Sequence, residues 1–244
     1  MDETRYSKSP ITEAILDIQV DVPAGLTPLA LGGCQDPVRH DYPTKRELKA
    51  AYAQFEMGAK VAASATSQDL GFAFVSADGQ QLFQVRTTGF TANRLAPYTH
   101  WEAFSREARK LWNVYRDTAK PLRITRIALR YINRFDIHVS PLELKDYFNT
   151  SPEVAGGLPQ SMAGFFMQVL LPLEDVKASV NIIETIVEPL KTGAVSIILD
   201  LDLFRVVELP ESEQELWNMF ELLRVKKNTV FNSCITERTK ELIR

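Results

Sequence analysis

Strict alternation of apolar and polar residues recurs along much of the chain and predicts β-strands. The clearest case is Ala14–Val22, where every second residue is apolar and the residues between are mostly acidic or amide-bearing. Asp78-Gly79 separates two further runs and is a strong signal for a tight hairpin turn. The strands predicted after Ala14–Val22 are Gly71–Ala77, Gln81–Arg86, Phe90–Leu95, Arg123–Val139, Phe165–Leu171, Ala178–Val187 and Ala194–Val207.

Helix starts are indicated by a Ser or Thr followed three residues later by Glu. In such a capping box the two side chains satisfy two backbone N–H groups that have no partner inside the helix. Apolar residues then recur at helical spacing after each pair, and their aromatic members are expected to pack in the core rather than stack on a ligand. The four pairs are Thr44/Glu47, Thr99/Glu102, Ser140/Glu143 and Ser212/Glu215.

The order of the predicted elements suggests an internal repeat. A strand, a capped helix, three strands and a long capped helix occupy residues 10–119 and recur over 121–244. Such a unit can place both helices on one face of an antiparallel sheet, and two units side by side make one wide sheet. We therefore predict an α+β fold with one wide antiparallel sheet, helices on one face, and two diverged β-α-β-β-β-α units within a single domain, 1–244.

Composition narrows the class of protein without naming a function. The 244 residues are 45% hydrophobic and 24% charged, which is typical of a globular protein. A formal net charge of −3 argues against a broad nucleic-acid surface, which requires a basic domain. The two cysteines, Cys34 and Cys234, lie far apart and suggest no disulfide framework. The start of the chain has no apolar signal sequence, and no apolar run can span a bilayer, so a cytoplasmic location is expected.

Several short segments resemble one prokaryotic family. They are Pro10–Ile15, Asn93–Tyr98, Arg126–Arg134 with its Arg-Tyr-Ile-Asn core, Asp146-Tyr147-Phe148, Asn228–Phe231 and Ile235-Thr236. This family is sporadically distributed among prokaryotes, has no assigned function, and has members of about this length. The resemblance implies a free-standing prokaryotic protein. Patchy distribution is typical of defence or toxin–antitoxin genes, and the resemblance supplies no catalytic residues.

A basic stripe on the strand Arg123–Val139 is the main candidate site. Its polar face carries Arg126, Arg130 and Arg134, which could clamp an anionic ligand such as a nucleotide or an RNA phosphate. The alternative, which we favour, is a lattice of ion pairs with carboxylates on neighbouring strands. The carboxylates available are Glu13, Asp17 and Asp21 on the first strand and Asp200 and Asp202 on the last. If the two first strands are neighbours, we expect one of the arginines to lie within ion-pair distance of Glu13, Asp17 or Asp21.

The sequence offers few residues that could form a metal-binding or cofactor-binding site. Asp200 and Asp202 share one strand face and could form a weak divalent-cation site. Two carboxylates at this spacing are, however, more often ordinary surface residues of a strand. No His or Cys pair has metal-ligand spacing, and no phosphate-binding or dinucleotide-binding motif is present. We expect no cofactor.

Three functions remain open at this point. The first is a non-catalytic binding or regulatory module for a protein or nucleic-acid partner, in a defence-type or toxin–antitoxin-type system. The second is an enzyme on an anionic substrate that uses the arginine face, and the third is a sensor of a small ligand. A non-catalytic module is preferred because no catalytic motif is recognisable. Oligomeric state is left open.

Overall fold

A computed structural model describes residues 6–56, 62–138, 142–160, 162–190 and 192–244. The chain forms one open, antiparallel, nine-stranded sheet in the order β2-β3-β4-β5-β1-β6-β9-β8-β7, which confirms the predicted α+β class. Its strands are β1 (Ile11–Asp21), β2 (Thr44–Glu56), β3 (Ala62–Val75), β4 (Gln81–Arg86), β5 (Gly89–Leu95), β6 (Arg123–Ile137), β7 (Phe166–Leu173), β8 (Ala178–Val187) and β9 (Val195–Arg205).

Over the residues that the structure describes, three α-helices and three 3-10 segments accompany the strands. No helix in the described part of the chain is long and apolar enough to cross a membrane. The helices are α1 (Trp101–Ala119), α2 (Glu213–Cys234) and α3 (Glu237–Ile243), and the 3-10 segments are η1 (Pro28–Val38), η2 (Leu144–Asp146) and η3 (Glu174–Val176).

The chain divides into two compact units. Unit 1 contains Met1–Leu16, Leu95–Tyr98 and Arg126–Arg244, and unit 2 contains Asp17–Arg94 and Thr99–Thr125. The boundary cuts through β1 and β6, so the units do not coincide with the repeats predicted at 10–119 and 121–244. The duplication therefore stays a prediction.

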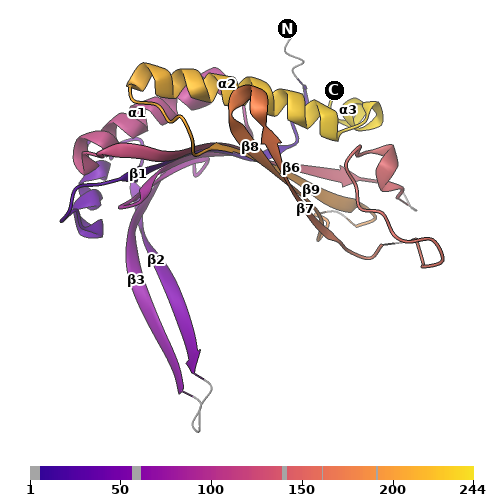
Figure 1. Ribbon diagram of the computed structural model, residues 1–244, viewed down its shortest axis with the longest axis horizontal. Coiled ribbons are helices and arrows are strands. Elements are labelled where there is room, and N and C mark those ends of the chain that lie inside the picture. The colour runs from indigo at the N-terminus through magenta and orange to yellow at the C-terminus, as the bar shows by residue number, and fades with distance from the viewer. Residues whose placement is uncertain (1–5, 57–61, 139–141, 161, 191) are drawn as a thin grey trace. The chain divides into compact units, whose positions relative to one another are not determined.

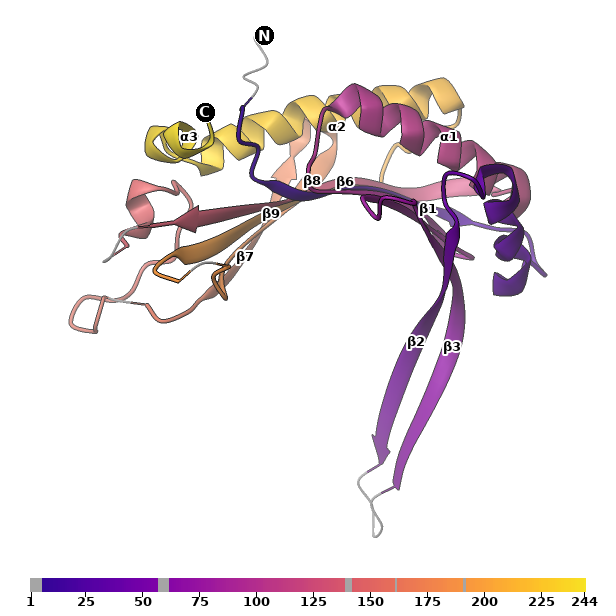
Figure 2. The ribbon, with the colours of Figure 1, turned by 180° about the vertical axis from the view of Figure 1, so that it is seen from behind.

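In unit 2, α1 lies along its strands (Figure 2), and aromatic side chains fill the core between them. The apolar residues that recur at helical spacing along α1 are buried: Trp101, Phe104, Ala108, Leu111 and Tyr115. Phe90 of β5 packs against Trp112 and Tyr115, with ring centroids 5.9 and 6.0 Å apart. These aromatic residues are core, as expected.

The helix predicted after Thr44 is wrong, because this segment is strand β2. All thirteen residues of β2 pair with β3, in a ladder from Thr44–Val75 to Glu56–Ala62. β4 pairs with β3 only over Gly71–Val75, so the rest of β2 and β3 forms a two-stranded ribbon (Figures 1 and 2). Backbone pairing with β3 overrides the helix-like spacing of Leu48 and Tyr52.

The other predicted caps have mixed outcomes. Ser212 caps α2 as expected, since Glu215 N donates to Ser212 Oγ at 3.2 Å and Ser212 N donates to Glu215 Oε2 at 3.1 Å. The N-cap of α1 is His100 rather than Thr99, and the ring of His100 accepts from Ala103 N at 3.2 Å. Ser140 lies outside the described residues, and only the three-residue segment η2 follows it.

In unit 1, α2 lies along one face of the strands (Figure 1). Its inward residues are buried, and Phe231 stacks beside Phe135 of β6 with ring centroids 6.4 Å apart. The opposite face is not covered by α2 and carries the arginine stripe. Alternation along each strand thus separates an apolar interior from a polar surface. The inward residues of α2 are Leu216, Trp217, Phe220, Leu223, Phe231 and Cys234.

Candidate functional site

The face of unit 1 opposite α2 is an ordered grid of side chains, which we call the open face. Strand register sets its four rows, because residues paired across an antiparallel ladder point to the same side. From β6 through β9 and β8 to β7, the rows are Ala128-Phe204-Ser179-Pro172, Arg130-Asp202-Asn181-Leu170, Ile132-Asp200-Ile183-Gln168 and Arg134-Ile198-Thr185-Phe166. The face thus changes from charged at β6 and β9 to uncharged and apolar at β7.

Arg130 and Arg126 pair with the two aspartates of β9. Arg130 donates from Nε to Asp200 Oδ1 at 2.8 Å and from Nη2 to Asp200 Oδ2 at 2.5 Å, which is a bidentate contact. Arg126 donates from Nη2 to Asp202 Oδ2 at 2.9 Å, and its guanidinium also lies over the ring of Phe204. The ion lattice therefore exists, built with the last strand, and Asp200 and Asp202 serve as arginine partners.

Charges around Arg130 shift its pKa and that of Asp202. The bidentate bond to Asp200, with further attraction from Asp202 and Glu13, raises the pKa of Arg130. Burial raises the pKa of Asp202, although Arg126 and Arg130 oppose this effect. Glu13 is thus among the carboxylates that favour the charged form of Arg130.

Arg134 belongs to a separate cluster at the other end of β6. Its Nε donates to Asp136 Oδ1 at 3.1 Å, and its Nη2 donates to Ser196 Oγ at 2.9 Å and to the Glu188 carbonyl at 2.8 Å. Ser196 Oγ also donates to Asp136. Burial alone would raise the pKa of Asp136, but the bonds from Ser196 and Arg134 lower it. All three predicted arginines therefore have carboxylate partners.

The acids of β1 that lie in unit 2 pair with other arginines. Asp17 Oδ2 accepts from Arg86 Nη2 at 3.0 Å and from Thr91 Oγ1 at 2.8 Å. Asp21 Oδ2 accepts from Arg123 Nε at 2.6 Å. Asp17 thus takes part in a cluster with residues of β4 and β5. The expected ion pairs between the stripe and the β1 acids stay a prediction.

A buried carboxyl, Glu184 of β8, was missed by the sequence reasoning. It is fully buried on the helix side of unit 1, and neither oxygen has a hydrogen-bond partner in the described part of the chain. Burial raises its pKa to about 8. The strand alternation of β8 could have flagged it, since Glu184 follows Val180 and Ile182 on the apolar face.

A desolvated lysine, Lys227 of α2, was missed as well. Its ammonium lies 4.0 Å from the centroid of the Tyr131 ring, and the Tyr131 and Tyr98 hydroxyls are 3.0 Å apart. Burial, and then repulsion from Arg224, lowers the pKa of Lys227 to about 7. Tyr131 is part of the Arg-Tyr-Ile-Asn segment, so this segment takes part in holding α2 on the sheet.

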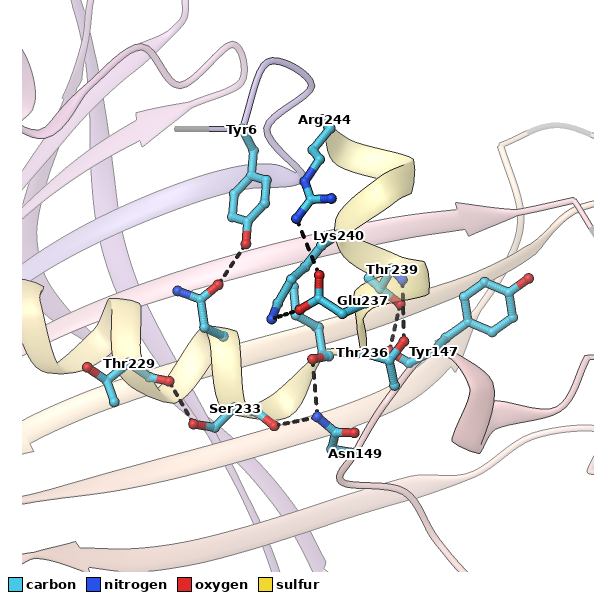
Figure 3. Close-up of polar contacts among 12 residues, drawn as sticks. Tyr6, Tyr147, Asn149, Thr229, Ser233, Thr236, Glu237, Thr239, Lys240 and Arg244 are labelled. Atoms are coloured by element: carbon cyan, nitrogen blue, oxygen red, sulfur yellow. Dashed lines mark hydrogen bonds and ion pairs between the residues drawn. The ribbon is translucent and has the colours of Figure 1, made fainter. Parts of the chain in front are cut away.

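Two other segments that carry the resemblance meet where α2 ends and α3 begins (Figure 3). Thr236 Oγ1 donates to the Asp146 carbonyl and Thr239 Oγ1 donates to the Tyr147 carbonyl, each at 2.6 Å. Asn149 Nδ2 donates to the Ile235 carbonyl at 3.1 Å. These bonds fix α3 to the segment after η2. Because they satisfy backbone groups, we assign this junction a structural role.

The described residues hold no group of three or more His, Cys, Asp or Glu side chains suited to a metal ion. A shallow pocket of about 360 Å³ lies beside the β7–β8 turn, and Lys177 at its rim pairs with Glu208 at 2.5 Å.

No protein-family model, curated protein or solved structure matches this chain. The open face is therefore interpreted from its own geometry.

Proposed function

We propose that this chain is a non-catalytic binding module whose open face in unit 1 recognises a protein partner. The observation that carries the proposal is the pairing of Arg126, Arg130 and Arg134 with carboxylates of the same face. Beside these pairs stand the exposed apolar side chains of β7, Phe166 and Leu170, at 66% and 62% exposure. Charge-paired residues next to exposed apolar residues are typical of a protein-binding surface.

The charge balance of the open face disfavours an anionic ligand. Among the described residues of this face, the three arginines stand with three carboxylates, those of Asp136, Asp200 and Asp202, and Glu13 of β1 attracts Arg130 as well. A phosphate would have to displace Asp200 from a bidentate contact, and that carboxylate is buried, so leaving it unpaired costs about 1–3 kcal/mol or more. An enzyme or sensor for nucleotides or RNA is therefore the less supported function.

The biological setting follows from the family resemblance alone. We propose a cytoplasmic protein of a defence-type or toxin–antitoxin-type system, in which such a module would bind the product of a neighbouring gene. This setting supplies the candidate partners for a direct test.

The test is co-expression with the products of the flanking genes. One product should co-purify with the chain at nearly equal stoichiometry. Ile183→Arg, at the centre of the open face, should abolish this association, and Asn181→Arg provides a second variant of the same face. Leu122→Arg is the matched control, because Leu122 is 69% exposed and lies in unit 2. Equal binding by all variants with unchanged melting temperatures, or no co-purifying product, would refute the proposal.

A further inference from the structure

Strand β7 is an edge strand whose one protecting feature in the described chain, Pro172, lies near its end. Its sequence, Phe-Met-Gln-Val-Leu-Leu-Pro-Leu, contains no charged residue, and within the described chain its only strand neighbour is β8. Phe166 and Leu170 are exposed on the open face, and Leu171 is 43% exposed on the other. Proteins normally protect an edge with lysines, prolines, bulges or covering segments, because free backbone groups there pair readily with another strand. Pro172 protects only one end of β7, so Phe166–Leu170 stay available.

Pro172 indicates which backbone groups of β7 are free. Proline has no N–H to donate, so in an edge strand its backbone nitrogen faces the free edge rather than the neighbouring strand. Backbone groups alternate in direction along an antiparallel strand. The N–H and C=O groups of Phe166, Gln168 and Leu170 therefore point outward with the C=O of Pro172. This free edge offers three N–H donors in succession.

The same strand is complementary to a second copy of itself. In an antiparallel pair centred on Gln168, each Phe166 lies opposite Leu170 of the other copy, and the two Gln168 residues lie opposite each other. On the reverse face Met167 lies opposite Val169. On the open face Pro172 lies opposite Gly164, which is outside the strand. The paired residues carry no charge, so like-charge repulsion does not oppose self-pairing.

We propose that two copies of this chain pair through β7 in antiparallel register about a two-fold axis at Gln168. In a closed two-fold dimer the β7 edges pair with each other, so neither stays free to bind a third copy. One eight-residue strand per copy makes a small interface, so the dimer should be weak and concentration-dependent. This pairing goes beyond the partner binding proposed above and does not depend on it.

Sedimentation of the full chain over a range of concentrations tests the pairing. The wild type should convert reversibly from monomer to dimer as the concentration rises to about 100 µM, an affinity range typical of small interfaces. Gln168→Pro removes the central outward N–H and should keep the protein monomeric, with its melting temperature nearly unchanged. Gln168→Ala retains that N–H and should still dimerise.

Cross-linking tests the register. Gln168→Cys places one thiol of each copy at the two-fold axis, where a short bis-maleimide should join them in high yield. Cys34 and Cys234 are buried and should not react. Gln214→Cys, on an exposed part of α2, measures random collision.

Several results would overturn the self-pairing. One is a wild type that stays monomeric at every concentration, and another is a dimer that persists in Gln168→Pro. A monomeric wild type in which Gln168→Pro abolishes binding of a co-expressed partner would show that β7 pairs with that partner instead. Failure of the flanking-gene test with an intact Gln168-dependent dimer would refute only the proposed function.

Discussion

The guanidinium of Arg130 donates two hydrogen bonds to the carboxylate of Asp200, from Nε at 2.8 Å and from Nη2 at 2.5 Å. The Asp200 side chain is 7% exposed and that of Arg130 is 41% exposed, so a mostly buried carboxylate is neutralised by a partly solvated cation. A bidentate arginine contact is the strongest geometry for such a pair. The stripe that resembles an anion site is thus an element of sheet structure.

Glu184 should make stability depend on pH. Its pKa is raised from 4.5 to about 8 in the folded protein, so between these values the folded state keeps a proton that the unfolded state loses. Stability should therefore fall as pH rises through this window, by about 1.4 kcal/mol per pH unit at most. Below pH 4.5 both states are protonated and this effect vanishes.

Urea unfolding of Glu184→Gln from pH 5 to pH 8 measures this effect. The variant should lose that share of the pH dependence and should exceed the wild type in stability at pH 8. Glu188→Gln, at an exposed acid near the end of the same strand, is the control and should follow the wild type. Parallel pH profiles for wild type and Glu184→Gln would contradict the assignment.

Loss of the Ser212 side chain, which caps α2, should cost more stability than loss of the Thr99 side chain before α1. Ser212→Ala loses the bond from Glu215 N and should destabilise the protein by about 1 kcal/mol. Thr99→Ala should have a smaller effect, because His100 is the residue that caps α1. Chemical denaturation of both variants measures the difference, and an equal loss would show that Thr99 contributes a cap after all.

The internal duplication makes a prediction about strand arrangement. About the β1–β6 pair, the sheet order places β5 opposite β9, β4 opposite β8 and β3 opposite β7, leaving β2 unmatched. A two-fold rotation should superpose the first set of elements on the second: β1, β3, β4, β5 and α1 on β6, β7, β8, β9 and α2. Strands that superpose only in a different order would rule out the duplication.

Local sequence patterns predicted most strands but failed where tertiary pairing decides. Gln81–Arg86 and Ala178–Val187 were predicted with the bounds found, because alternation and turn residues are local signals. Thr44–Glu56 was read as a helix because a Thr–Glu pair and the apolar spacing both resemble a helix start. Its strand structure depends on pairing with β3, which no local pattern reveals.

The site was predicted in part. Alternation placed Arg126, Arg130 and Arg134 on one polar face, but the choice of partner strand depends on sheet order. The prediction offered acids of both β1 and β9 as partners. Asp200 and Asp202 of β9 pair with Arg130 and Arg126, and pairing with the β1 acids stays a prediction. The importance of Glu184 was missed because burial by α2 depends on packing across the sheet.

The central claim, that the arginine stripe is an ion network rather than an anion site, is tested by Arg130→Ala. The substitution leaves the Asp200 carboxylate without its bidentate partner, so stability should fall by about 1–3 kcal/mol. Asp200→Asn in the same background should recover part of the loss, because it removes the unpaired charge. The matched control is Arg39→Ala, at an exposed arginine that pairs with exposed Asp36.

The most direct measurement is calorimetric titration of the wild type and Arg130→Ala with ATP and with a short single-stranded RNA, alongside their melting temperatures. The account predicts no binding of either ligand by either protein and a clearly lower melting temperature for Arg130→Ala. Saturable binding to the wild type that disappears in Arg130→Ala, with the melting temperature unchanged, would contradict it and establish an anion site.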